Sequence, residues 1–163
     1  MPIEFLTQEQ RSYYGKFSGE PSNDQLSRYF HFDDTDLFII NNHRRDHNRL
    51  GFALQLATVR FLGAFLSNPS DVPENTLRFI AAQIGISDIS CLKEYMKRQS
   101  VHYEHSAEIQ YKYGYHDFST GLWRFKLSRL LYTRSWVSNE RPSVMFDFST
   151  AWLIQHKVLL PGV

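Results

Sequence analysis

A dense group of cationic and polar side chains occupies residues 43–49, in the order His-Arg-Arg-Asp-His-Asn-Arg. An arginine offers five N–H donors in a planar fork and is always charged, so it suits phosphate oxygens and the edges of bases. Arginines at the start of a helix oppose the helix dipole, so helix stability does not explain their presence there. The cluster predicts a phosphate-binding surface made of Arg44, Arg45, His47, Asn48 and Arg49.

The adjacent Asn48 and Arg49, together with Lys93 farther along the chain, are the first candidates for reading bases. Asparagine forms paired hydrogen bonds with adenine, and arginine forms them with guanine. An intramolecular interpretation stays open beside this one, because the same arginines can pair with carboxylates of the chain itself. The nearby candidates are Asp33, Asp34, Asp36 and Asp46.

Residues 81–92 resemble a helix-turn-helix corner. The small Ala81 lets a second helix approach, and Gly85 permits a left-handed turn. Leu92 and Tyr95 then anchor the second helix inward. Its outer face, suited to the major groove of DNA, carries Ser90, Lys93, Lys97 and Arg98. A corner between two helices without any ligand has the same pattern, so both interpretations stay open.

A third set of cations lies on a helix expected at 117–136, which places Trp123 and Leu127 on one face. Lys126 and Arg129 are three residues apart and share another side of that helix. They either continue a basic surface or form a solvated helix face.

The sequence contains no pattern typical of a catalytic or metal centre. It lacks a P-loop, a nucleophile elbow, a dinucleotide-binding glycine motif and the two-histidine zinc motif. His43 and His47 have helical ligand spacing, as do His102 and His105, but Cys91 is the only thiol available to complete a site. The tyrosines near 103–115 either stack on bases or pack between helices. We therefore expect no catalytic residue, metal or cofactor in this region.

Helices are expected along almost the whole chain. Thr7 with Gln10, and Ser22 with Gln25, form capping boxes. The stretch 46–66 is apolar on most of its circumference, which requires burial on several sides. The expected helices are 8–14, 23–30, 33–42, 46–66, 71–84, 89–98, 100–113, 117–136 and 143–157. This pattern predicts an all-α fold.

The composition is globular, with 42% hydrophobic and 21% charged residues among 163. The net charge of +1 gives no overall signal for nucleic acid. The charge is uneven, however, since residues 1–42 hold three basic and seven acidic residues and the rest hold fifteen and ten. A single cysteine excludes an internal disulfide and fits a reducing cytosol. Residues 1–6 do not have the pattern of a signal peptide, and no stretch is apolar enough to predict a membrane span.

Several segments, in order along nearly the whole chain, resemble transposases of the Tn3 family. They are Met1–Gly15, Leu26–Asp36, Asp46–Leu56, Arg60–Gly63, Tyr113–Phe118 and Leu159–Gly162. The resemblance implies the N-terminal part of a much larger replicative transposase, which binds the terminal inverted repeats of the transposon. It also implies that the catalytic DDE triad and its divalent metals lie far downstream. The family does not indicate which side chains here contact bases.

These observations predict an all-α, multi-helix unit with helix-turn-helix-like DNA-binding elements. We expect a first DNA-binding module at 1–68, a second at 69–136, and at 137–163 a helix leading into the rest of the transposase. The expected partners are double-stranded DNA at the transposon end, the remaining transposase chain and a second transposase subunit. We expect the protein in the bacterial cytoplasm, at the nucleoid when it is bound to DNA, and we expect no membrane partner. The alternative is an interaction or autoinhibitory scaffold that contacts the transposase core or a second subunit. The abundance of aromatics and the acidic first 42 residues favour that role.

Overall fold

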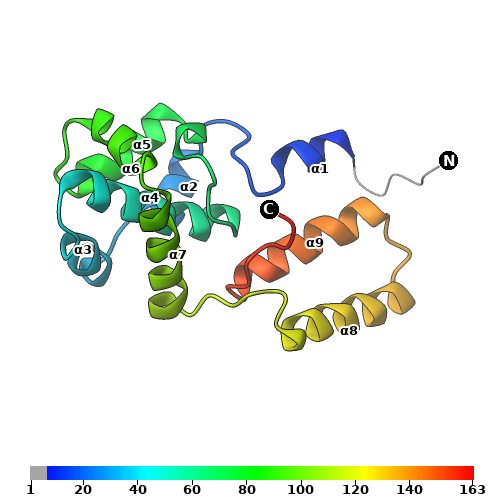
Figure 1. The fold of residues 1–163 in the computed structure, drawn as a ribbon. Helices are drawn as coiled ribbons and strands as arrows, with labels where there is room; N and C mark the ends of the chain where they lie inside the picture. Colours follow the sequence, from blue (N-terminus) through cyan, green and yellow to red (C-terminus); the bar gives the residue numbers. More distant parts are fainter. Residues whose placement is uncertain (1–6) are drawn as a thin grey trace.

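The computed structural model describes residues 7–163, so the expectation about a signal peptide at 1–6 lies outside the described residues. The described part consists of helices and the loops between them, with one isolated β-bridge between His116 and Val158. Its α-helices are α1 (Gln8–Tyr13), α2 (Asn23–Tyr29), α3 (Asp34–Asn41), α4 (Asp46–Leu62), α5 (Glu74–Gln83), α6 (Leu92–Met96), α7 (Gln99–Tyr113), α8 (Gly121–Val137) and α9 (Pro142–Gln155). The 3-10 turns η1 (Pro69–Asp71) and η2 (Ile89–Cys91) precede α5 and α6. The predicted all-α class is confirmed (Figure 1).

The first two helices begin at the capping boxes that the sequence predicts. Thr7 accepts a hydrogen bond from the backbone N–H of Gln10, and the Gln10 side chain accepts one from the N–H of Thr7. Ser22 and Gln25 repeat this exchange at α2. These bonds satisfy backbone donors that a helix start leaves free, so the entry points are fixed by local sequence.

Four predicted helix boundaries are wrong by several residues. The helix expected at 71–84 starts at Glu74, because Pro69–Asp71 forms the turn η1 and Pro73 is the N-cap of α5. The helix expected at 46–66 ends at Leu62, because Gly63 takes a left-handed backbone (φ +73°) where α9 packs against it. The helix expected at 89–98 is η2 followed by the short α6, since the side chain of Asp88 binds the N–H of Ser90 and starts a tighter turn. The helix expected at 117–136 starts at Gly121, because Asp117 accepts hydrogen bonds from Ser119 and holds a turn.

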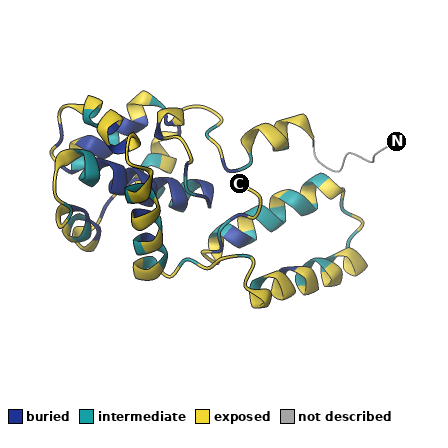
Figure 2. Cartoon of the chain, in the orientation of Figure 1, coloured by how far each residue is buried: buried dark blue, intermediate teal, exposed yellow. Residues whose placement is uncertain are grey.

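Two apolar clusters hold the described residues together. The larger one surrounds α4, whose residues 50–59 are all buried, and draws side chains from α2, α3, α5, α6 and α7. The smaller one lies between α8, α9 and the segment after α9, around Leu127, Leu153, Val158 and Leu160. Figure 2 shows the dark, buried residues concentrated in the first cluster. The modules 1–68, 69–136 and 137–163 stay a prediction about binding units, while the larger apolar cluster includes residues on both sides of position 68.

The segment after α9 joins the two clusters. The N–H of His116 donates to the carbonyl of Lys157 (2.8 Å), and the N–H of Leu159 donates to the carbonyl of His116 (2.9 Å). The N–H of Leu160 donates to the carbonyl of Gly63 at the end of α4 (2.9 Å). The hydroxyl of Tyr14 donates to the carbonyl of Pro161 (2.8 Å), so α1 is attached at the same place.

The crossing of α4 and α6 depends on Gly51. A Cβ atom there would lie 2.5 Å from three carbons of the buried Tyr95 ring. We expect Gly51→Ala to lower the free energy of unfolding by about 1–3 kcal/mol, because the added methyl group overpacks the core. At a helix position with open space, by contrast, replacing glycine with alanine stabilises the protein.

Gly121→Ala is the matched control, because the same Cβ at Gly121 meets nothing within 4 Å. Urea unfolding of both variants checks the prediction. A Gly51→Ala protein as stable as the parent would show that α6 moves away from α4 at no cost.

Candidate nucleic-acid interface

Two of the predicted cationic segments, separated by about forty residues in the sequence, lie at the same end of the molecule. The loop 42–45 enters α4 beside the corner formed by α5, η2 and α6 (Figure 1). Arg49 spans the two, since its Nη2 donates to the carbonyl of Ile84 (2.7 Å) at the end of α5. The charges of Asp46 and Asp88 both act on Cys91, whose pKa is raised mainly by burial. The fold therefore forms one surface from residues 44–48 and 90–98.

Arg49 is bound within the chain rather than free at this surface. Besides Ile84, its guanidinium donates to Oδ1 of Asn41 (2.6 and 3.2 Å) and to Oδ1 of Asp46 (3.1 Å). The intramolecular pairing of an arginine of this cluster with a carboxylate is thus observed for Arg49 and Asp46. These bonds join the end of α3, the start of α4 and the end of α5. The role of Arg49 as a DNA contact stays a prediction, and its geometry makes it a residue that positions the corner.

Arg44 and Arg45 have a different environment, because both side chains are exposed and form no ion pair within residues 7–163. Arg45 is the N-cap of α4 at φ +70° and ψ 141°, a backbone region that normally requires glycine. Its carbonyl accepts from the N–H groups of Asn48 and Arg49, which fixes this conformation. The side chain of Asn48 donates to the carbonyl of Arg44 (3.1 Å), and this hydrogen bond also stabilises the loop.

The second cationic segment, residues 90–98, keeps its polar side chains exposed while Leu92 and Tyr95 are buried. Ser90, Lys93, Lys97 and Arg98 are all exposed. Lys97 pairs with Glu94 (2.8 Å), which lowers the pKa of that carboxyl, and the charges of His47 and Arg98 lower it further. His47 at the start of α4 is therefore close enough to α6 to affect the pKa of Glu94. Within the described residues, Lys93 and Arg98 form no ion pair.

The turn between α5 and α6 has the geometry that the sequence indicates. Gly85 takes a left-handed backbone (φ +70°), and Ala81, Leu92 and Tyr95 are buried. The second helix is only the five residues of α6, shorter than a helix that fills a major groove. Its helix-turn-helix character as a DNA reader stays a prediction.

The third predicted set lies elsewhere. Lys126 stands over the ring of Trp123, 4.5 Å from its centroid, and Arg129 is exposed on the same helix. Figure 1 places α8 at the opposite end of the molecule from α3 and α6. The fold therefore does not bring Lys126 and Arg129 to the surface formed by residues 44–48 and 90–98.

A buried ion pair was not predicted. Asp36 is 2% exposed and accepts two hydrogen bonds from the guanidinium of Arg60 (2.8 and 2.9 Å) and one from the Tyr113 hydroxyl (2.9 Å). Burial acts to raise the pKa of Asp36, but the hydrogen bonds and charge of Arg60 outweigh it and lower the pKa. One signal was present in the sequence: Arg60 is the single cation in the mostly apolar stretch 50–62. The pair joins α3, α4 and α7.

The tyrosines near 103–115 divide into a half-buried pair and an exposed pair. Tyr113 and Tyr115 are half-buried between helices, which is the packing role. Tyr103 and Tyr111 are exposed on α7, and Tyr111 is 89% exposed. Stacking of bases stays a prediction for these two alone.

A cluster of histidines lies beneath the arginine loop. His43 precedes Arg44, and its ring centroid is 4.3 Å from that of Phe52 and 4.6 Å from that of His105. Its buried Nε2 lies 3.6 Å from a carboxylate oxygen of Glu108 and has no hydrogen-bond partner among the described residues. In residues 7–163 no three ligand side chains gather as a metal site would need, and no helix combines the length and apolarity of a membrane span.

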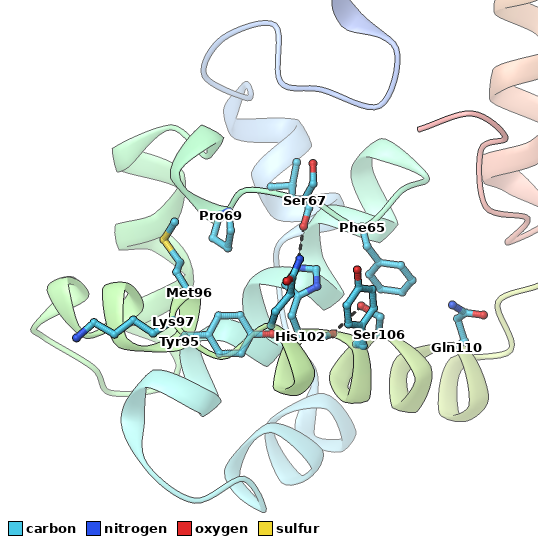
Figure 3. A pocket seen from close by; sticks show the side chains of 12 residues that line it. Phe65, Ser67, Pro69, Tyr95, Met96, Lys97, His102, Ser106 and Gln110 are labelled. Carbon is cyan, nitrogen blue, oxygen red and sulfur yellow. Dashed lines mark hydrogen bonds between the residues drawn. The ribbon is translucent and has the colours of Figure 1, made fainter.

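His105 extends this cluster toward α6. Its Nδ1 is 3.1 Å from the hydroxyl of Tyr95, and the amide of Gln55 donates to the same hydroxyl. A hydroxyl that accepts from Gln55 can donate its own proton to Nδ1 of a neutral imidazole. Ser106 donates to Oε1 of Gln55 (2.6 Å). Figure 3 shows Tyr95, His102 and Ser106 on the wall of a pocket of about 630 Å³.

This cluster predicts an acid-sensitive fold. Burial, with a contribution from the charge of His43, lowers the pKa of His105 to about 4, whereas an unfolded histidine titrates near 6.5. Between these values only the unfolded chain binds the proton, so stability is complete above pH 6.5 and is lost as the pH falls toward 4. From pH 7.5 to 5.0 we expect a loss of about 2 kcal/mol from this group.

His105→Asn keeps a hydrogen-bond acceptor near Tyr95 and removes the titration. Urea unfolding at the two pH values should show a smaller loss for the variant than for the parent. Equal losses would assign the pH dependence to other groups.

The sequence matches a family described as "Domain of unknown function (DUF4158)" over residues 5–163. It is similar to the transposase for transposon gamma-delta of Escherichia coli (strain K12), with 52% identity over 162 residues, 99% of this chain and 16% of that protein. It is also similar to the transposase for transposon Tn1546 of Enterococcus faecium, with 33% identity over 98% of this chain and 16% of that protein.

The transposase for transposon Tn21 of Escherichia coli is 31% identical over 87% of this chain and 14% of that protein. The chain thus spans about one sixth of the length of its first relatives. These matches agree with the resemblance found in the sequence. The chain belongs to the DUF4158 family, the N-terminal domain of Tn3-family transposases.

Proposed function

We propose that this chain binds double-stranded DNA at the terminal inverted repeats of a transposon, as the N-terminal part of a DDE transposase. One observation carries the proposal. Arg44, Arg45, Lys93 and Arg98 are exposed at one end of the molecule and form no ion pair within residues 7–163. Cations that no carboxylate of the chain neutralises are available to phosphate, even though the net charge is only +1.

Phosphate contacts supply most of the affinity of such a surface and make it fall steeply with salt. Arg45 and Lys93 are suited to contact phosphates on either side of a DNA groove, because they come from the two cationic segments at this end of the protein. Base reading belongs to the first turn of α4 rather than to α6, since α6 has only five residues. Asn48 in that turn, whose side chain donates to the carbonyl of Arg44 in the free protein, is the candidate for reading a base.

The catalytic domain belongs to another part of the transposase in this proposal, and the present domain supplies binding alone. It acts in the bacterial cytoplasm, at the nucleoid when bound. Linked DNA-binding modules reach high combined affinity from modest individual surfaces. A near-neutral domain with one cationic end fits that arrangement.

Loss of the two exposed arginines should weaken DNA binding. We expect Arg44→Ala/Arg45→Ala to reduce affinity for an inverted-repeat duplex about tenfold or more and to lower the salt slope of log Kd by about 2, one unit for each lost phosphate contact. Gel-shift titrations at two salt concentrations, with a scrambled duplex beside the repeat, measure both quantities.

Lys16→Ala/Arg28→Ala is the control, because it removes two exposed cations elsewhere and changes the net charge equally. If both double variants lose the same affinity, the effect is one of total charge and not of this surface. If the parent does not prefer the repeat over the scrambled duplex at either salt, the scaffold role is favoured.

The backbone of Arg45 offers a second test. Glycine adopts its φ of +70° without strain, so Arg45→Gly should raise the free energy of unfolding by about 1 kcal/mol. Arg45→Ala keeps the strain. If the guanidinium contacts DNA, both variants lose affinity and only the glycine variant gains stability. A glycine variant with parental affinity would remove Arg45 from the interface.

A further inference from the structure

The outer side of α8 carries a stripe of exposed large side chains. Leu122, Phe125, Arg129, Tyr132 and Trp136 follow the spacing of three and four residues that aligns side chains along one face of a helix. The four apolar members are between 60% and 75% exposed. We call these five residues the α8 stripe.

The α8 stripe borders a hollow of about 460 Å³. Leu122, Phe125 and Arg129 of the stripe line it, together with Lys126, Leu130 and Thr133 of the same helix and Trp152 of α9. In Figure 2 the outer side of α8 lies along the margin of the molecule and is coloured as exposed. Contiguous exposed apolar side chains of this size mark a protein interaction surface.

The charge of α8 indicates what covers the stripe. The helix contains Arg124, Lys126, Arg129 and Arg134 and no carboxylate. Arg134 pairs with Glu140 (2.7 Å), but Arg129 forms no ion pair within residues 7–163. An apolar partner without an acid would leave this guanidinium desolvated and unpaired, which is costly. The complementary surface is therefore apolar with a carboxylate opposite Arg129.

We propose that the α8 stripe docks an amphipathic helix that carries a carboxylate in its apolar face, and that this helix belongs to the transposase polypeptide outside residues 1–163. The 3.5-residue spacing of the stripe is the pattern by which two helices pack along their length. The chain spans 16% of its first relatives, so a family member has abundant polypeptide to supply such a helix.

Two other occupants fit the stripe less well. A second copy packed α8 against α8 in antiparallel fashion about the middle of the stripe would bring Arg129 against its own counterpart. Duplex DNA would face Leu122, Phe125 and Trp136 with phosphates, which gain nothing from apolar contact. The inference is independent of the DNA-binding proposal, because it concerns the opposite end of the molecule.

Hydroxyl-radical footprinting tests the docking. The gamma-delta transposase with this chain in place of its matched region is compared, without DNA, with the chain of residues 1–163 alone. We expect oxidation of Tyr132 and Trp136 to be several-fold slower in the chimera. Tyr111, exposed on α7 and outside the stripe, should oxidise equally in both proteins, and the buried Tyr95 should stay protected in both as a check of folding.

Charge reversal identifies the contact. Arg129→Glu in the chimera should restore the oxidation of Tyr132 and Trp136, whereas Arg124→Glu, on the same helix but off the stripe, should not. Equal oxidation of the stripe in chimera and isolated chain would overturn the proposal. So would protection that appears only on raising the concentration of the isolated chain, or only on adding DNA. Oxidation of Tyr95 in the chimera would show that the chimera is not correctly folded. The gamma-delta transposase itself is then footprinted, and an exposed helix at the position aligned with α8 would overturn the proposal.

Discussion

Burial of α4 on every side is the constraint on which the rest of the structure depends. A helix with no exposed face along residues 50–59 must be covered by several neighbours, and five other helices contribute to its cover. Gly51 lets α6 lie directly against it, and Gly63 ends it where α9 and the segment after α9 arrive. Only the ends of such a helix can face a partner. The exposed arginines accordingly lie in the loop at its start.

Polar side chains fix how the covering helices are oriented around α4. Arg60 binds Asp36 and thereby sets α3, and the Tyr113 hydroxyl adds α7 to the same carboxylate. Gln55, near the middle of α4, meets Tyr95 of α6. Each buried polar group has a large desolvation cost if its partner is lost, so these contacts favour one arrangement over others of similar apolar packing. Arg49 adds a fourth link, from α4 to the end of α5.

The two ends of the molecule thus differ in chemistry. At the α4–α6 end the cations are mostly exposed and surrounded by polar residues, as a phosphate surface requires. At the α8 end, cations alternate with large apolar side chains, as a protein interface requires. A near-zero net charge conceals this division, because the acidic residues of the first forty-two positions balance the cations of both ends.

The sequence alone determined the helical class, the starts of α1 and α2 and the buried nature of α4, because caps and apolar periodicity act over a few residues. It also indicated the left-handed Gly85 and the inward Leu92 and Tyr95. Which arginine is free was decided only by the tertiary structure. Arg49 is bound because Asn41 at the end of α3 and Ile84, 35 residues away, reach its guanidinium, while Arg44 and Arg45 have no such neighbours. The separation of Lys126 and Arg129 from the other cations has the same origin. Local patterns record which side chains share a helix face, but the position of one helix beside another depends on packing around the whole core.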